Sequence, residues 1–150
     1  MAEPRAVPQI DRAFASTLPN VSEAVREIAR FCRARLDSGE AGEIAAEQIE
    51  LCVAEALTNV VKHAYDRRET ETVRVSCALG PGKVVVEIRD NGRELPAEVL
   101  KRGALEPMTQ VTGELPESGF GWHLILDQMD VVEYSREDGR NRLTLIKHLE

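Results

Sequence analysis

The sequence predicts a two-layer α+β sandwich, in which a mixed, mostly antiparallel sheet carries helices on one face. The first half holds two long segments with apolar residues at helical spacing, and the second half holds two pairs of alternating segments around glycine turns. Because helices and hairpins come in separate blocks, α+β is favoured over alternating α/β. With 43% apolar residues, the 150-residue chain is predicted to form a single domain, residues 1–150, with a real core.

The N-terminal elements are one strand and two helices. Weak alternation predicts a strand from Gln9 to Ser16, which Pro19 ends. Asn20, with Glu23 three residues later, is expected to cap a helix that runs to about Leu36. A second, more apolar helix is predicted over residues 41–65.

The C-terminal half is expected to hold two hairpins around a helix. The first hairpin pairs residues 72–79 with 84–90, and the second pairs 131–135 with 142–148 around Asp138-Gly139. A short helix is predicted over 96–101 and a longer one over 121–129. Residues 102–118 have no periodicity and contain two glycines and two prolines. So long a loop in a compact domain is usually functional, and it is predicted to be a lid.

The end of the second helix carries the first candidate motif. At about 100° per residue, Glu55, Asn59 and Lys62 fall within roughly 60° of one another. The opposite side is an apolar stripe of Val53, Ala54, Leu57, Val60, Val61 and Ala64. A solvated face of an amphipathic helix is the plain alternative. Asn59, however, is a poor residue for a helix interior, which favours a binding role.

Two glycine-containing segments form the second and third candidate motifs. Asp90-Asn91-Gly92 ends an apolar strand, so its carboxylate could accept from an amino group beside a flat ring; a simple turn is the alternative. Gly119-Phe120-Gly121 is predicted at a helix N-terminus, where free N–H groups favour phosphate. The alternative is that these glycines belong to an ordinary loop and bind nothing.

Charge and cysteine content exclude several classes of function. A net charge of −7 argues against general nucleic-acid binding, which requires cationic side chains. No basic amphipathic segment indicates a membrane surface, and no window is apolar for long enough to span a bilayer. Three scattered cysteines in apolar patterns are expected to be buried free thiols, as in a cytoplasmic protein.

Together the three motifs carry a resemblance to a known family. Residues 55–65 (Glu-Ala-Leu-Thr-Asn-Val-Val-Lys-His-Ala-Tyr), 90–92 (Asp-Asn-Gly) and 119–125 (Gly-Phe-Gly-Trp-His-Leu-Ile) resemble the N-box and the two glycine boxes of the histidine-kinase-like ATPases. Within that superfamily, the chain looks most like the small anti-sigma-factor serine/threonine kinases of bacterial partner-switching modules. The resemblance covers the chain from about Pro19 to its end and implies the ATPase fold of that superfamily.

The resemblance implies ATP and Mg²⁺ as cofactors and assigns roles to the motif residues. Asn59 would coordinate the metal, Glu55 would act as general base, and Lys62 would help with phosphate charge. Asp90 and Gly92 would hold adenine, and Gly119 and Gly121 would let the lid wrap the phosphates. Such phosphoryl transfer needs mainly positioning and charge neutralisation.

The implied partners are an anti-sigma-factor antagonist, which receives the phosphate, and a sigma factor, with the kinase itself a homodimer. One alternative is a non-catalytic nucleotide-binding module that acts only by binding a partner. This alternative is supported by the pair Arg93-Glu94, which occupies the place where the family's first glycine box usually has a second glycine. A structural domain with incidental motifs is the third possibility, and the joint pattern argues against it.

Overall fold

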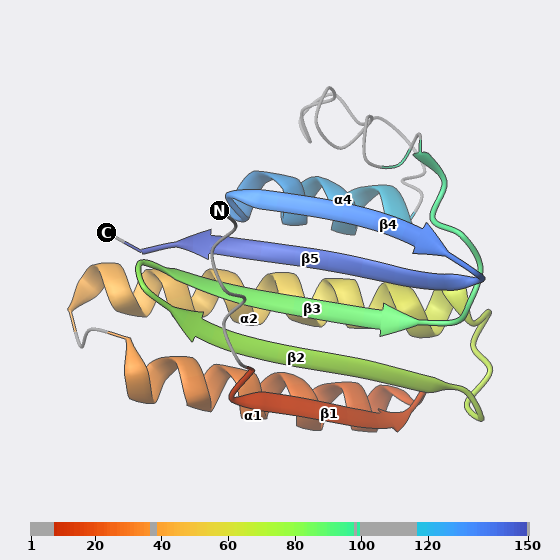
Figure 1. The fold of residues 1–150 in the computed structure, drawn as a ribbon, viewed down its shortest axis with the longest axis horizontal. Helices are drawn as coiled ribbons and strands as arrows, with labels where there is room; N and C mark the ends of the chain where they lie inside the picture. Colours follow the sequence, from red (N-terminus) through yellow and green to blue (C-terminus); the bar gives the residue numbers. More distant parts are fainter. Residues whose placement is uncertain (1–7, 37–38, 98, 100–116, 150) are drawn as a thin grey trace.

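The structure, a computed structural model, describes residues 8–36, 39–97, 99 and 117–149. Figure 1 shows the arrangement of its helices and strands. Their bounds in chain order are β1 Ile10–Ala15, α1 Leu18–Arg35, α2 Glu40–Asn59, the π-helical turn η1 Val60–Ala64, β2 Thr72–Gly80, β3 Lys83–Asp90, α4 Glu117–Gln128, β4 Val131–Glu137 and β5 Arg140–His148.

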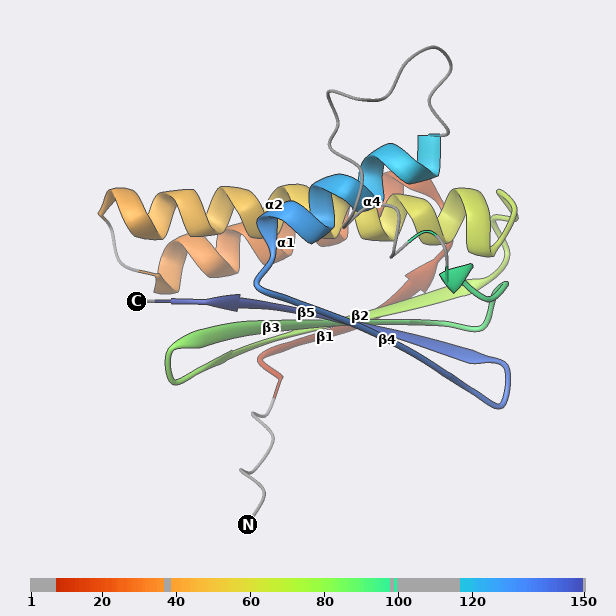
Figure 2. The ribbon, with the colours of Figure 1, turned by 90° about the horizontal axis from the view of Figure 1, so that it is seen from above.

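The strands form one sheet in the order β1-β2-β3-β5-β4, and each neighbouring pair among them is antiparallel. Figure 2 shows α1, α2 and α4 together on one face of this sheet. The predicted fold class, an α+β sandwich with helices on one side, is therefore confirmed. Within the described residues no helix is long and apolar enough to cross a bilayer.

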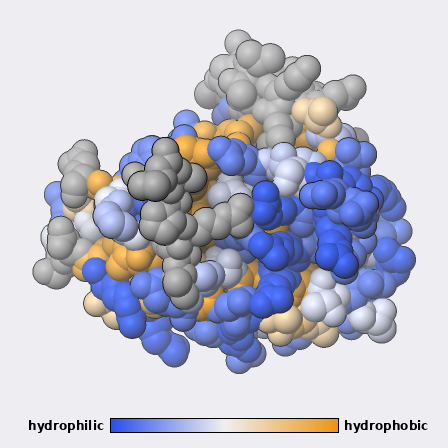
Figure 3. Space-filling model, in the orientation of Figure 1, coloured by the Kyte–Doolittle hydropathy of each residue, from blue (hydrophilic) through white to orange (hydrophobic). Residues whose placement is uncertain are grey.

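The core lies between the sheet and the helices, because alternate strand residues point toward the helix layer. Those of β2 and β3 are fully buried: Val73, Val75, Cys77, Val84, Val86 and Ile88. The face left open, seen in Figure 3, is largely hydrophilic. Arg74, Arg89 and Arg142 lie side by side on it across β2, β3 and β5. All three cysteines are buried and free, as predicted.

The first helix begins earlier than the sequence predicts. Thr17, and not Asn20, is its N-cap: the Thr17 hydroxyl accepts from the backbone N–H of Asn20 at 3.2 Å. Pro19 therefore lies inside the first turn of α1 and does not precede the helix. A proline is tolerated there because the first N–H groups of a helix have no partner within it.

The second helix ends in a π-turn that the sequence did not predict. η1 follows Asn59 directly, with Tyr65 N–H donating to Val60 O at 2.9 Å. Asp66 and Arg67 then reverse the chain with positive φ angles of 50° and 63°. Wider turns of this kind are frequent at functional sites. Here the turn leaves the carbonyl of Ala64 to accept from Arg93 N–H at 2.8 Å, which ties the loop after β3 to the helix end.

The helix after the expected lid also begins earlier than predicted. α4 starts at Glu117, so Gly119 and Gly121 lie within the helix and Gly121 falls in its second turn. The predicted start at residue 121 is therefore late by about one turn, while Gly119 lies in the first turn of the helix. Residues 102–116 of the predicted lid lie outside the described residues, as does part of the short helix expected over 96–101.

Candidate functional site

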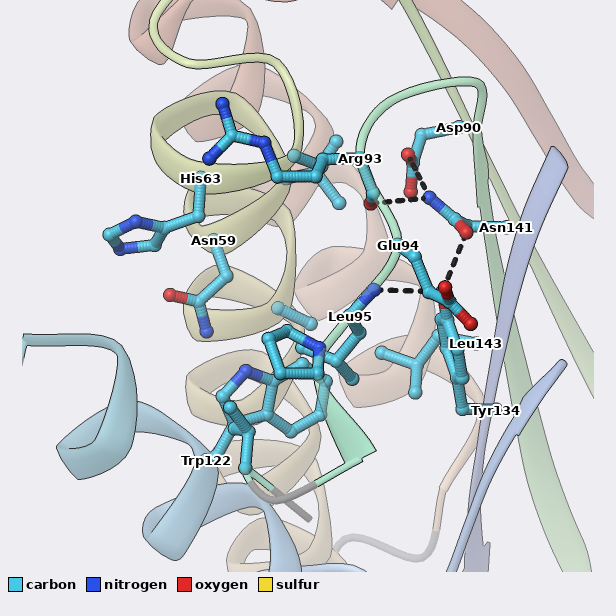
Figure 4. Close-up of a pocket in the computed structure, with 15 residues that line it drawn as sticks. Asn59, His63, Asp90, Arg93, Glu94, Leu95, Trp122, Tyr134, Asn141 and Leu143 are labelled. Atoms are coloured by element: carbon cyan, nitrogen blue, oxygen red, sulfur yellow. Dashed lines mark hydrogen bonds between the residues drawn. The ribbon is translucent and has the colours of Figure 1, made fainter. Parts of the chain in front are cut away.

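A cavity of about 250 Å³ opens between the end of α2, the start of α4 and the ends of β3, β4 and β5. Figure 4 shows its walls. The residues that line it are Ala56, Asn59, Val60, His63, Ala64, Asp90, Arg93, Glu94, Leu95, Pro96, Val99, Trp122, Tyr134, Asn141 and Leu143. Two of the predicted site residues, Asn59 and Asp90, thus line the same cavity from opposite layers of the fold.

The helical wall holds a polar group that its surroundings do not satisfy. Asn59 Nδ2 is buried and has no hydrogen-bond partner among the described residues. In Figure 4 the amide points toward Trp122 across the cavity. Burying an amide nitrogen without a partner costs about 1–3 kcal/mol, which argues against Asn59 as an ordinary residue of a solvated helix face. Such a group is typical of a site that a polar ligand completes.

Gly121 brings the first and third motifs together. A Cβ at this position would lie 2.8 Å from Glu55 Oε2 and 3.4 Å from Asn59 Nδ2, so a larger residue would displace the Glu55 carboxylate. Glu55 is half-buried beneath this contact, one helical turn before Asn59. Lys62 lies in η1 and does not line the cavity. Gly119 is described only as part of α4.

Asp90 is the polar group on the sheet side, with 7% of its surface exposed. Its Oδ1 accepts from Gly92 N–H and from Asn141 Nδ2, both at 2.8 Å. Burial raises the pKa of Asp90 above its usual value, and these two hydrogen bonds and the charge of Arg136 oppose that rise. The bond to Gly92 is an Asx-turn, so the turn interpretation of Asp90-Asn91-Gly92 is also correct.

The structure explains why position 92 requires glycine, and the explanation differs from the one expected from the sequence. A Cβ on Gly92 would lie 2.5 Å from Ala64 O and 2.7 Å from Ala64 C. Glycine is therefore required because the loop after β3 packs against the backbone at the end of η1. Gly92 does not line the cavity.

Three residues of the C-terminal hairpin complete the sheet side of the site, and sequence reasoning missed them. Asn141 is 4% exposed and donates to Asp90. Its Oδ1 accepts from Tyr134 Oη at 2.6 Å and from Arg136 Nη1 at 2.7 Å. One signal was available: Asn141 is a polar residue in phase with the buried Leu143 and Leu145 of β5.

Much of the remaining wall of the cavity is apolar and includes aromatic rings, while His63, Arg93 and Glu94 add polar side chains. Trp122, 4% exposed, lines it from α4, and Tyr134 and Leu143 line it from the sheet. A cavity with apolar and aromatic side chains and the buried carboxylate of Asp90 suits a heteroaromatic ring that carries a hydrogen-bond donor. The chemistry of the cavity therefore fits a purine base with an amino group.

The comparisons with known proteins agree with this geometry. The sequence profile of the histidine kinase-like ATPase domain matches residues 14–147. The chain belongs to the histidine kinase-like ATPase family. The family predicted from the three motifs is thus confirmed.

The curated relatives are anti-sigma factors and protein kinases. The chain is 29% identical over 99 residues to an anti-sigma F factor of Clostridium beijerinckii, an alignment that covers 66% of this chain and 67% of the relative. It is 30% identical over 101 residues to the serine/threonine-protein kinase BtrW of Bordetella bronchiseptica, covering 67% of this chain and 68% of the relative. Both alignments thus span about two thirds of the relative, and they confirm the predicted likeness to anti-sigma-factor kinases.

A solved structure supports the fold. The chain superposes on a chain of the SiaB-SiaC complex from Pseudomonas aeruginosa with a TM-score of 0.63 at 15% identity, covering 93% of this chain and 89% of the other. At this level of identity the likeness concerns the fold alone.

Proposed function

We propose that this protein is an ATP-dependent serine/threonine kinase that phosphorylates a small anti-sigma-factor antagonist and, in its other state, sequesters a sigma factor. One observation carries the proposal. A single cavity has a buried carboxylate, Asp90, on its sheet side and, on its helical side, Asn59, whose buried amide nitrogen has no partner among the described residues. This arrangement suits a nucleotide with its base at Asp90 and its phosphates toward Asn59.

In this proposal Asp90 selects the base. Its Oδ1 is used by Gly92 and Asn141, which leaves Oδ2 to accept from the amino group of adenine. Trp122 and Leu143 provide apolar surface for the ring, and Arg93 and Glu94 line the cavity where the family usually has its second glycine.

The residues on the helical side fit a magnesium-bound triphosphate. Among the residues described there is no cluster of three or more His, Cys, Asp or Glu side chains, so the protein alone offers no full metal cage. Mg²⁺ usually keeps several waters and is held by one or two protein oxygens together with phosphates. The amide of Asn59 would supply such an oxygen, and the bound ion would neutralise the charge that develops on the transferred phosphoryl group. Lys62, Gly119 and Gly121 would lie nearest the phosphates.

Glu55 is the proposed general base. It lies one turn before Asn59 on the same helical face, and α4 packs over it at Gly121. A half-buried carboxylate at this position can take the proton from an incoming serine or threonine hydroxyl as its oxygen attacks the last phosphate. No other catalytic side chain is required for phosphoryl transfer of this kind.

The partners are proposed from the relatives and from the resemblance. The relatives carry the names of an anti-sigma factor and a protein kinase, which supports one protein that both binds a regulator and transfers phosphate. We also propose a homodimer, which the resemblance to the anti-sigma-factor kinases implies. A non-catalytic nucleotide-binding module remains the second candidate, because the bulky pair Arg93 and Glu94 borders the cavity.

One experiment separates these functions. The purified protein is incubated with ATP, magnesium and a candidate anti-sigma-factor antagonist from the same organism, and the intact mass of the antagonist is measured. A gain of one phosphate, lost when magnesium is chelated, is expected for the kinase. ATP binding by calorimetry without phosphate transfer would support the non-catalytic module. If the protein binds no ATP, neither nucleotide-based function holds.

Trp122 offers an independent readout of the cavity. Because its indole lines the slot proposed for the base, adding Mg-ATP should shift or quench its fluorescence, and GTP at equal concentration should do so less. The chain has one tryptophan, so the signal is unambiguous. Calorimetric binding of ATP with unchanged emission would place the base outside this cavity.

A further inference from the structure

We propose that Asn141 is a positioning residue that makes Asp90 selective for a purine with a 6-amino group over one with a 6-oxo group. The inference rests on the proposed function, because it concerns the base of the nucleotide in the same cavity. Asn141 lies directly opposite Asp90 in the β3–β5 pairing, so the two side chains leave the sheet on the same face. It would act through Asp90 and need not touch the reacting atoms.

The oxygen of the Asn141 amide faces only donors. Tyr134 Oη lies 2.6 Å from Asn141 Oδ1 and also accepts from Leu95 N–H at 2.9 Å. The hydroxyl proton of Tyr134 is therefore directed to Asn141. Arg136 Nη1 donates to the same Oδ1 at 2.7 Å, so both lone pairs of the amide oxygen are used.

The nitrogen of the amide faces only acceptors. Nδ2 lies 2.8 Å from Asp90 Oδ1, 2.9 Å from Arg93 O and 3.3 Å from Gly92 O. Rotating the amide by 180° would bring its oxygen against three other oxygens, and its NH₂ group against two donors. The network therefore fixes the orientation of Asn141, and with it the side that donates to Asp90.

A fixed donor at Oδ1 controls what Asp90 can offer a ligand. Asn141 Nδ2 and Gly92 N–H both donate to Oδ1, and hydrogen bonds donated to a carboxylate favour its ionised form. An ionised Asp90 can only accept, and Oδ2, which receives no hydrogen bond from the described residues, is the oxygen available to a base. A 6-amino group can donate to it, whereas a 6-oxo group would place oxygen against oxygen.

The test compares ATP with inosine triphosphate, which carries the 6-oxo group on an otherwise similar purine. Affinities are measured by calorimetry for the parent, for Asn141→Asp and for Asn141→Leu. In Asn141→Asp two carboxyl groups face each other and cannot both ionise easily, so Asp90 can carry a proton on Oδ2 and donate it to a 6-oxo group. We expect the parent to prefer ATP and Asn141→Asp to lose about ten- to a hundredfold of that preference, the range of one hydrogen bond to a charged group. Asn141→Leu, which leaves Gly92 N–H as the donor to Asp90 Oδ1, should also lower the ratio of ATP affinity to inosine-triphosphate affinity.

Tyr134→Phe is the matched control. It removes a donor to Asn141 Oδ1 and the acceptor of Leu95 N–H, but it keeps the contact between Asn141 and Asp90. It should weaken both nucleotides by similar factors and preserve their ratio. If Asn141 only stabilised the fold, Asn141→Asp and Asn141→Leu would likewise weaken both nucleotides by similar factors and leave their affinity ratio unchanged.

The outcomes separate the inference from the proposed function. The inference is overturned if the parent prefers ATP and the Asn141 variants keep the same ratio of ATP affinity to inosine-triphosphate affinity. The proposed function would still stand in that case. A parent that binds neither nucleotide overturns the proposed function and the inference with it. Circular dichroism identifies variants that do not fold. If Asn141→Leu is among them, the ratio in the nearly isosteric Asn141→Asp and in Asn141→Ser decides.

Discussion

Replacing Glu55 with glutamine is expected to slow phosphate transfer to the antagonist by roughly 10²- to 10⁴-fold, the usual effect of removing a general base. The substitution keeps the shape of the side chain under Gly121 and removes its ability to take a proton. ATP affinity should change little, because Glu55 does not line the cavity proposed for the base. Single-turnover transfer, followed by intact mass, and calorimetry with ATP measure the two effects separately.

Glu50→Gln is the matched control on the same helix. Glu50 pairs with Arg33 at 2.9 Å on the surface, and a pair of this kind contributes at most about 1 kcal/mol. This variant should therefore transfer phosphate at the parental rate. If Glu55→Gln does so as well, Glu55 is not the base. If both variants transfer phosphate slowly, the slower rate results from a general disturbance of α2 and not from the loss of a general base.

The sequence was sufficient to predict the elements that carry the first two motifs, because the information there is local. Helical periodicity placed Glu55 and Asn59 on one face, and alternation placed Asp90 at the end of a buried strand. A turn at Asp138-Gly139 follows from two adjacent residues that tolerate positive φ, 52° and 75° here. In each case neighbouring residues determine the conformation.

The features that the sequence did not predict depend on contacts between distant segments. Asn141 faces Asp90 only because β5 pairs with β3 in one register, and nothing near Asn141 specifies that register. The same applies to Gly121, whose role depends on how closely α4 approaches α2. The π-turn after Asn59 is a third case: the sequence continues at helical spacing, while the packing of Ala64 against the loop after β3 accompanies the wider turn.

The glycine of the second motif leads to the other large expected effect. Gly92→Ala should destabilise the protein by about 1–3 kcal/mol, the cost of overpacking, and should weaken ATP binding strongly. The added Cβ would lie 2.5 Å from Ala64 O and 2.7 Å from Ala64 C, which are backbone atoms that no rotamer change can move. The loop would have to retreat, which breaks the 2.8 Å hydrogen bond from Arg93 N–H to Ala64 O. Urea unfolding and calorimetry with ATP measure the two losses.

Gly139→Ala separates this contact from the general cost of replacing a glycine. Gly139 has a φ of 75° and open space around its Cα, so alanine should cost about 1–2 kcal/mol of backbone strain and leave the cavity intact. Gly92 has no such φ, and its requirement is steric. We therefore expect both variants to lower the free energy of unfolding. Only Gly92→Ala should also weaken ATP binding by the folded protein. Gly92→Ala with parental stability and ATP affinity would show that the loop after β3 can leave η1 without disturbing Asp90, and the contact with Ala64 would then have no part in forming the site.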